Sequence, residues 1–129
     1  MASPSPADQL LGILRETVVA LVRRDGPDLS LRQLAVFLTC YLREGAHTVR
    51  GLAAELGVSK PAISRALDRL GELDLARRKV DSDDWRSVIV QRTPKGAVLL
   101  RDLRSILSEA TQRARRNGHH GAEQSRAAG

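Results

Sequence analysis

Aromatic residues are scarce in this chain, whose 129 residues include one Phe, one Trp and one Tyr. Proteins that bind single-stranded nucleic acid stack bases on several aromatic side chains, so this scarcity disfavours that class of function. It also means that aliphatic side chains must fill any core. Apolar residues make up 42% of the chain and charged residues 28%, which is typical of one globular domain.

Cysteine and long apolar segments are scarce as well. The single cysteine, Cys40, excludes a disulfide bond within the chain. Apolar runs such as Ala97–Leu100 are far shorter than the roughly 20 residues that span a bilayer. Residues 1–7 contain no basic segment followed by an apolar one, so no secretory signal is expected. These observations predict a cytoplasmic protein that does not associate with a membrane.

The sequence contains no pattern typical of an enzyme or of a cofactor site. It has no nucleophile with a nearby His and acid, no Gly-rich phosphate loop and no cluster of metal ligands. The histidines are His47, His119 and His120, and the adjacent pair stands in a segment predicted to be flexible, without the fixed ligands that a metal site requires. We therefore expect no catalysis, no metal and no cofactor.

Positive charge is in excess and lies in the second half of the chain. The 21 Lys and Arg residues against 15 Asp and Glu residues leave a net charge of +6. Residues 1–47 are balanced with five of each sign, whereas residues 93–129 carry seven basic and three acidic residues. Such an excess favours an anionic partner, either nucleic acid or a membrane surface.

Helical periodicity and capping residues predict the first half of the fold. Residues 1–7 are rich in Ser and Pro and are predicted to be a disordered lead. A helix is expected from about Ala7 to Arg24, stopped by Gly26-Pro27. Ser30 is a candidate N-cap for a second helix that ends before Gly45.

Residues 48–75 predict a helix-turn-helix. Thr48 can cap a short helix through about Leu56, and Gly57 can adopt the left-handed conformation that ends it. Ser59 can cap the next helix, with Pro61 in its first turn. The polar side of this second helix is formed by Lys60, Ser64, Arg65, Asp68 and Arg69.

The remaining segments predict a wing, a last helix and a tail. Residues 76–92 combine two short strand-forming stretches with the turn-rich segment DSDDW, which indicates a β-hairpin. Thr93-Pro94 starts a helix expected to end near Arg116, and residues 117–129 are predicted to be a flexible tail. Residues 8–116 would thus form one winged helix-turn-helix domain, mainly α with a small β-hairpin.

A helix of this kind binds duplex DNA by entering the major groove with its N-terminal half. Lys60 and Arg65 can reach guanine O6 and N7, and Arg69 is placed to meet the backbone. The alternative is a solvated helix face in which Asp68 pairs with these cations. The residues predicted to contact DNA from the helix-turn-helix are Thr48, Ser59, Lys60, Pro61, Ala62, Ser64, Arg65 and Arg69.

Two segments, LAAELGVSKPAISRALDRL and DSDDWRSVIVQRTPKG, resemble the MarR family of winged helix-turn-helix transcription regulators, over roughly residues 30–107. The first resembles the family's turn and recognition helix, and the second its Asp-x-Arg wing with the following Thr-Pro and Gly. The resemblance implies a homodimer whose first and last helices pair and whose recognition helices enter successive major grooves of a pseudo-palindrome. It adds Asp84, Trp85 and Arg86 as wing residues at the DNA, with Arg86 in the minor groove.

The chain departs from the family pattern at three places. Trp85 stands where members often have a basic residue, which favours packing on the hairpin over a groove contact. Arg92 replaces a usual apolar residue, and its stem is expected to lie along the edge of the core. Members commonly have two long C-terminal helices, whereas one is predicted here, so the dimer interface should be smaller or rearranged.

Apolar faces on the first and last helices exceed what so small a domain can bury internally, which predicts a two-fold symmetric dimer. The predicted dimerisation residues are Leu10, Leu14, Leu21, Leu99, Leu103, Ile106 and Leu107. The family often senses phenolic ligands or oxidants. For Cys40 a buried, inert thiol is favoured over a redox sensor. Phe37 and Tyr41 fit a ligand pocket and core packing equally well, and no effector is identified.

The sequence as a whole predicts a sequence-specific, double-stranded DNA-binding transcription regulator, a repressor acting as a homodimer on a pseudo-palindromic site. The alternative is a winged-helix module that binds proteins, with the basic last helix docking an acidic partner. Salt dependence separates the two, because phosphate contacts give a steep salt slope that a small protein interface need not show.

Overall fold

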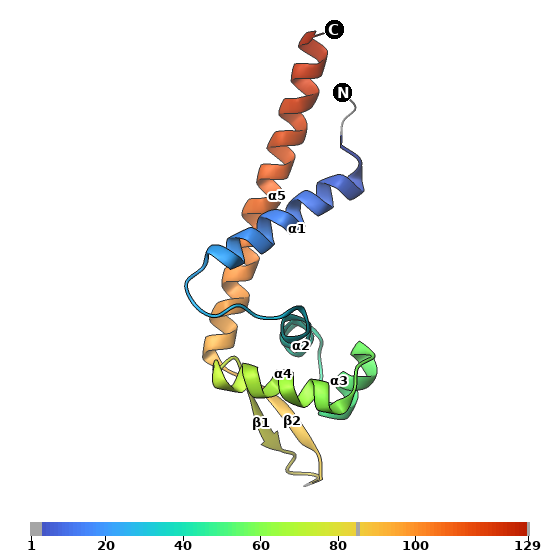
Figure 1. The fold of residues 1–129 in the computed structure, drawn as a ribbon, viewed down its shortest axis with the longest axis vertical. Coiled ribbons are helices and arrows are strands. Elements are labelled where there is room, and N and C mark those ends of the chain that lie inside the picture. Colours follow the sequence, from blue (N-terminus) through green and yellow to red (C-terminus); the bar gives the residue numbers. More distant parts are fainter. Residues whose placement is uncertain (1–3, 85, 129) are drawn as a thin grey trace. The chain divides into compact units, whose positions relative to one another are not determined.

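The computed structural model describes the backbone of residues 4–84 and 86–128, and side chains up to residue 117. The elements in this part of the chain are α1 (Pro6–Arg23), α2 (Leu31–Leu42), α3 (Val49–Leu56), α4 (Lys60–Glu72), β1 (Ala76–Val80), β2 (Val88–Arg92) and α5 (Pro94–Ala128), as Figure 1 shows. The predicted fold class, mainly α with a small β-hairpin, is confirmed.

The chain divides into two compact units. Residues 29–100 form the winged unit, which holds α2, α3, α4, the hairpin and the start of α5. The segments up to Asp28 and from Arg101 onward form the terminal unit. The 35 residues of α5 make a helix about 50 Å long, so one helix contributes to both units.

Side-chain caps define the helices of the winged unit. The Ser30 hydroxyl oxygen accepts from the Gln33 N–H at 3.1 Å, and the Gln33 side chain accepts from the Ser30 N–H in return. Thr48 and Ser59 cap α3 and α4 as predicted, and Gly57 ends α3 with φ 66°. The positive φ explains the glycine, because other residues rarely adopt this conformation.

The core of the winged unit is aliphatic, with one aromatic pair. Its most deeply buried side chains come from α2, α3 and α4 and are Val36, Phe37, Leu52, Ile63 and Leu70. The Phe37 and Tyr41 ring centroids lie 4.4 Å apart in this core. Both rings therefore pack in the core, which supports the core-packing alternative for Phe37 and Tyr41.

The wing is attached to the rest of the unit along β2. β1 and β2 pair antiparallel, in a register that runs from Ala76 opposite Arg92 to Val80 opposite Val88. On the other edge of β2, Ile89 forms a bridge with Thr48, and the Val90 N–H donates to the His47 carbonyl at 2.8 Å. The segment before α3 therefore extends the predicted hairpin by a third, very short partner.

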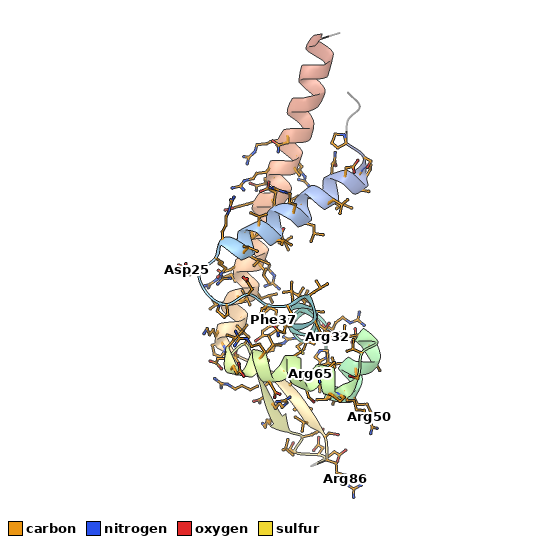
Figure 2. The ribbon with its side chains drawn as sticks, in the orientation of Figure 1. Asp25, Arg32, Phe37, Arg50, Arg65 and Arg86 are labelled. Carbon is orange, nitrogen blue, oxygen red and sulfur yellow. The ribbon has the colours of Figure 1, made fainter. Side chains whose placement is uncertain are left out.

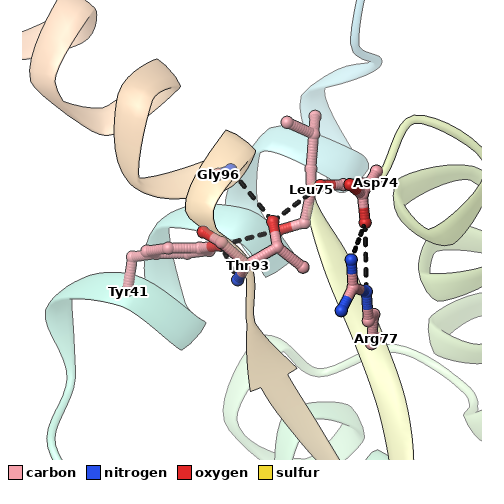
Figure 3. Close-up of polar contacts among 6 residues, drawn as sticks. All are labelled: Tyr41, Asp74, Leu75, Arg77, Thr93 and Gly96. Carbon is pink, nitrogen blue, oxygen red and sulfur yellow. Dashed lines mark hydrogen bonds and ion pairs between the residues drawn. The ribbon is translucent and has the colours of Figure 1, made fainter.

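The Tyr41 hydroxyl joins α2 to the turn before β1 and to the start of α5 (Figure 3). It donates to the Leu75 carbonyl at 2.7 Å and accepts from the Thr93 N–H at 2.9 Å. The Thr93 hydroxyl donates to the Asp74 carbonyl at 2.6 Å and accepts from the Gly96 N–H at 2.9 Å. Thr93 thus caps α5, as predicted, and also holds the turn that leads into the wing.

Arg92 lies at the end of β2 and beside the edge of the core, which confirms the expected course of its stem. Its Nε donates to the Cys40 carbonyl at 3.0 Å, and its guanidinium lies 5.6 Å from the centroid of the Tyr41 ring. Both contacts are made by the guanidinium, which donates to a carbonyl and also lies near an aromatic ring.

The terminal unit differs from the sequence expectation at both ends. Ser5 and Asp8 form a capping box, so α1 begins at Pro6 and the predicted lead of seven residues is shorter. α5 continues to Ala128 instead of ending near Arg116, where a flexible tail was expected. The continuation of α5 has a simple reason, because no proline follows Pro94 and a glycine inside a helix costs only about 1 kcal/mol.

Ion pairs connect α1 and its C-cap to α5. They are Arg24–Asp102 (2.9 Å) and Glu16–Arg113 (3.3 Å).

Candidate nucleic-acid interface

One side of α4 is buried and the opposite side is exposed. Ala62, Ile63, Ala66, Leu67 and Leu70 face the core, whereas Lys60, Pro61, Arg65 and Asp68 are exposed. The Ala62 side chain is only 5% exposed, so its predicted contact with DNA is corrected. The helical period explains the error, because Ala62 lies on the same face as Ala66. The exposed side is the candidate DNA-binding face.

Lys60 and Arg65 are available to an anion. Neither forms an ion pair or a side-chain hydrogen bond with any residue that the structure describes, and Figure 2 shows Arg65 on α4. Asp68, the partner expected if this face were merely solvated, pairs instead with Arg78 of β1. The arrangement therefore leaves two cations on the N-terminal half of α4 with donors to spare.

Thr48 and Ser59 have donors left after they cap their helices. The Thr48 Oγ1 accepts from the Gly51 N–H at 3.0 Å, and the Ser59 Oγ accepts from the Ala62 N–H at 3.2 Å. A hydroxyl has one donor besides its acceptor sites, so each proton can still be given to a phosphate oxygen. Both hydroxyls lie at helix N-termini, where the backbone favours an anion.

Arg69 and Ser64 lie further along α4 and are both half-buried. The Arg69 guanidinium pairs with the Glu72 carboxylate at 2.9 Å. A surface pair of this kind contributes about 0–1 kcal/mol, so a phosphate can replace Glu72. The Ser64 carbonyl accepts a hydrogen bond from Arg78 at 2.7 Å.

Asp84 shapes the tip of the wing. Its carboxylate accepts from the Arg86 backbone N–H and from the Ser87 hydroxyl, both at 3.1 Å. The Ser87 N–H donates to the Asp84 carbonyl at 2.9 Å, which closes the turn. The Arg86 side chain is exposed and extends away from the hairpin (Figure 2). Trp85 lies outside the described residues, as do the side chains of His119 and His120.

The sequence analysis missed two arginines of this face. Arg50, in the first turn of α3, is exposed and has no side-chain partner in the part of the chain that the structure describes. Figure 2 shows it in the winged unit with Arg65 and Arg86. The first helix of a helix-turn-helix crosses the DNA backbone, which is the signal that could have identified it. Arg78 was missed because its partners come from another element.

Comparison with known proteins finds a family model that matches the central part of the chain. Residues 27–87, from the segment before α2 through the wing tip, match a family model described as MarR family. This segment, 61 of the 129 residues, is similar to the MarR family. Members of this family are transcription regulators, and the winged helix-turn-helix found here is their fold. No match was found among the curated proteins.

Solved structures of MarR-family and other transcription regulators have the same fold. The regulator BldR from Sulfolobus solfataricus is 26% identical, with a TM-score of 0.56, and the match covers 82% of this chain and 81% of BldR. MarR from E. coli, in its apo form, is 24% identical with a TM-score of 0.62, covering 81% and 73%. BpsR from Bordetella bronchiseptica, whose DNA binding is regulated by 6-hydroxynicotinic acid, is 20% identical with a TM-score of 0.56, covering 88% and 81%.

The residues predicted for dimerisation are only partly exposed in this chain. Leu10 and Leu14 of α1 are 66% and 56% exposed, and Leu107 of α5 is exposed too. Leu21, Leu99 and Ile106 are half-buried. Leu103 is 6% exposed within the single chain, so it stabilises the monomer fold.

The helices described also lack any segment long and apolar enough to cross a membrane.

Cys40 is buried in the core of the winged unit. Burial raises the pKa of its thiol from 9.0 to about 11, although the Arg92 charge acts in the opposite direction. A thiol with so high a pKa stays protonated near neutral pH and reacts slowly. This environment supports the inert reading over redox sensing.

Proposed function

We propose that the protein is a sequence-specific transcription repressor that binds duplex DNA as a homodimer on a pseudo-palindromic site. The observation that carries the proposal is the exposed side of α4, where Lys60 and Arg65 have no partner among the described residues. The match of residues 27–87 to the MarR family model supports the same activity. α4 enters the major groove in this proposal, with Arg65 donating to guanine O6 and N7.

The phosphate backbone is bound from several elements at once. Donors that precede Arg65 in the chain come from Arg50, from the Thr48 and Ser59 hydroxyls, and from the N-termini of α3 and α4. Arg69 supplies a donor that follows Arg65. Arg86 supplies a cation at the wing tip, where a narrow A·T-rich minor groove has strongly negative potential. The phosphate contacts fix the position and orientation of the protein on the duplex, and Arg65 contacts the base edges.

Dimerisation follows from the apolar face of α1. Its exposed large side chains are Leu10, Leu11, Leu14, Val18 and Val22. Exposed apolar surface of this extent on one helix marks an interface, and a two-fold operation places the same helix of two chains against each other. Two recognition helices would then contact half-sites roughly 34 Å apart, one turn of DNA.

Selection of bound duplexes from a random-sequence pool tests the proposal. We expect the protein to enrich an inverted repeat with half-sites one helical turn apart. Titrations of the enriched and a shuffled duplex should then differ by about 10³-fold or more, with affinity falling steeply as salt increases. Equal affinity for both duplexes with a shallow salt slope would contradict the proposal and favour a protein-binding winged helix.

A matched pair of arginine variants controls for charge. Arg65→Ala and Arg32→Ala each remove one exposed arginine from the winged unit, but Arg32 lies on α2 and is not part of the proposed face. The first variant should reduce discrimination between the two duplexes, and the second should leave it unchanged. Repression is tested with a reporter gene controlled by the enriched site, whose expression should fall when the protein is present.

A further inference from the structure

One side chain joins the wing to the recognition helix. Arg78 of β1 donates from Nη1 to the Asp68 carboxylate and from Nη2 to the Ser64 carbonyl, the latter at 2.7 Å. Ser64 and Asp68 are four residues apart on α4 and therefore lie one above the other on one face of the helix. The planar guanidinium can bind both at once, which the point charge of a lysine cannot do in the same way.

The wing is held on its other strand as well. Arg78 stands opposite Val90 in the β1–β2 register, and the Val90 N–H donates to the His47 carbonyl just before α3. At the Arg78–Val90 pair, the wing is therefore bonded to α4 through β1 and to the segment before α3 through β2. The tip, which carries Arg86, extends beyond this level.

The ion pair also changes the charge that α4 presents to DNA. Asp68 is exposed and lies one turn after Arg65, on the polar side of the helix. A carboxylate at this place repels phosphate, and binding to Arg78 neutralises it. Arg78 thus removes an unfavourable charge from the face while it holds the helix against the wing.

We infer that Arg78 is a positioning residue for operator recognition. By binding Asp68 and Ser64 together, it sets the angle between α4 and the wing, so that Arg65 and Arg86 reach their grooves at the same time. This inference rests on the proposed function, because it requires that both elements contact one duplex.

A direct contact between Arg78 and a phosphate is the competing role, and the two roles differ in a measurable quantity. A lost phosphate contact lowers affinity for all sequences, whereas a lost brace lowers affinity for the operator more than for other DNA. The ratio of the dissociation constants for random and operator duplexes, measured at one salt concentration, separates them. General effects of a changed net charge cancel in this ratio.

The test uses Arg78→Ala, Asp68→Ala and the double variant, with Arg77→Ala as the matched control. Arg77 is the neighbouring arginine on β1, but its guanidinium pairs with Asp74 in the preceding turn, at 2.9 and 3.1 Å. We expect each single brace variant to lower the ratio by about threefold to tenfold. The double variant should lower it no further than Arg78→Ala, because Arg78→Ala already removes both the Asp68 ion pair and the Ser64 hydrogen bond. Arg77→Ala should leave the ratio unchanged.

Three results would overturn the inference. The first is an unchanged ratio in Arg78→Ala with weaker binding to both duplexes, which assigns the residue to a phosphate. The second is additive loss in the double variant, and the third is an equal loss in Arg77→Ala. Melting temperatures of all variants show whether the winged unit stays folded, and Arg78→Lys, which keeps the charge, should restore affinity for random DNA without restoring the ratio.

The wild-type protein separates this inference from the function on which it rests. If the wild type shows no preference for any duplex, the proposed function fails before the variants are considered. If it discriminates and Arg78→Ala discriminates equally well, the proposed function stands and the positioning role is wrong.

Discussion

Gly96 stands in the first turn of α5, where a side chain would collide with the junction around Tyr41. A Cβ at this position would overlap the Tyr41 hydroxyl and lie 2.6 Å from the Leu75 carbonyl oxygen. Tyr41 can move only by giving up its hydrogen bonds to Leu75 and Thr93. The Thr-Pro-x-Gly pattern at residues 93–96 therefore has a structural reason, which is close packing of the helix start against α2.

We expect Gly96→Ala to lower the free energy of unfolding by about 1–3 kcal/mol, the usual cost of overpacking. Chemical denaturation followed by circular dichroism measures this. Gly12→Ala is the control, because nothing lies within 4 Å of a Cβ there and alanine favours a helix over glycine. Equal stability of Gly96→Ala and wild type would contradict the tight junction.

The Cys40 thiol should react slowly with thiol reagents at pH 8 in the folded protein and quickly after denaturation. Its pKa is raised from 9.0 to about 11 by burial, so the unfolded chain ionises first as pH rises. The associated stability is therefore fully present below about pH 9 and is lost as pH rises toward 11. Cys40→Ala should make the decline in stability over this range shallower. Rapid labelling of the native protein would refute the buried assignment.

Arg65 and Arg50 should affect DNA binding in different ways. Arg65→Ala is expected to cost about 1–3 kcal/mol on the operator and to relax base preference at one position of each half-site. Arg50→Ala should weaken binding to all sequences and make the salt slope shallower by about 1, because one phosphate contact is removed. Titrations over a range of salt concentrations measure both effects. Equal losses on operator and random DNA in both variants would show that this division of roles is wrong.

At the scale of elements, the wing tip holds a residue that shapes the turn, Asp84, and a residue proposed to contact DNA, Arg86. Asp84 accepts two hydrogen bonds that close the turn, whereas the Arg86 side chain extends from it (Figure 2). Arg86→Ala should lose preference for A·T-rich sequence flanking the half-sites. Asp84→Ala should weaken the same preference by loosening the turn.

Binding to duplexes with A·T-rich and G·C-rich flanks, together with thermal melting, measures these effects. Lower stability of Arg86→Ala with unchanged flank preference would make Arg86 a brace of the hairpin. These substitutions should not change the strand register of the wing, because β2 is bonded to β1 on one side and to residues before α3 on the other.

At the scale of the whole molecule, the exposed apolar side chains of α1 predict a dimer. Light scattering at micromolar concentration should give the mass of two chains for the wild type. Leu14→Asp should shift the mass toward one chain, because it places a charge in the proposed interface. Leu31→Asp is the control, since Leu31 is an 84% exposed leucine of α2, outside that interface. A wild-type monomer, with and without DNA, would remove the basis for palindromic recognition.

Short-range chemistry made most of the winged unit predictable from the sequence. Ser30, Thr48 and Ser59 cap helices through atoms three residues away, and Gly57 ends α3 through its own backbone angle. Such signals can be found in any window of a few residues. The order of helices and hairpin and the exposed position of Arg65 followed from them. The end of α5 did not, because glycines without a proline only weaken a helix.

Contacts between distant residues had to come from the tertiary structure. Arg78 finds Asp68 and Ser64 across 10 and 14 residues, and Arg92 reaches Cys40 across 52. When several acidic residues lie within reach of a basic side chain, the packing of the elements that carry them decides which one it pairs with. Local sequence therefore determines where the cations stand, and the fold determines which of them remain available to DNA.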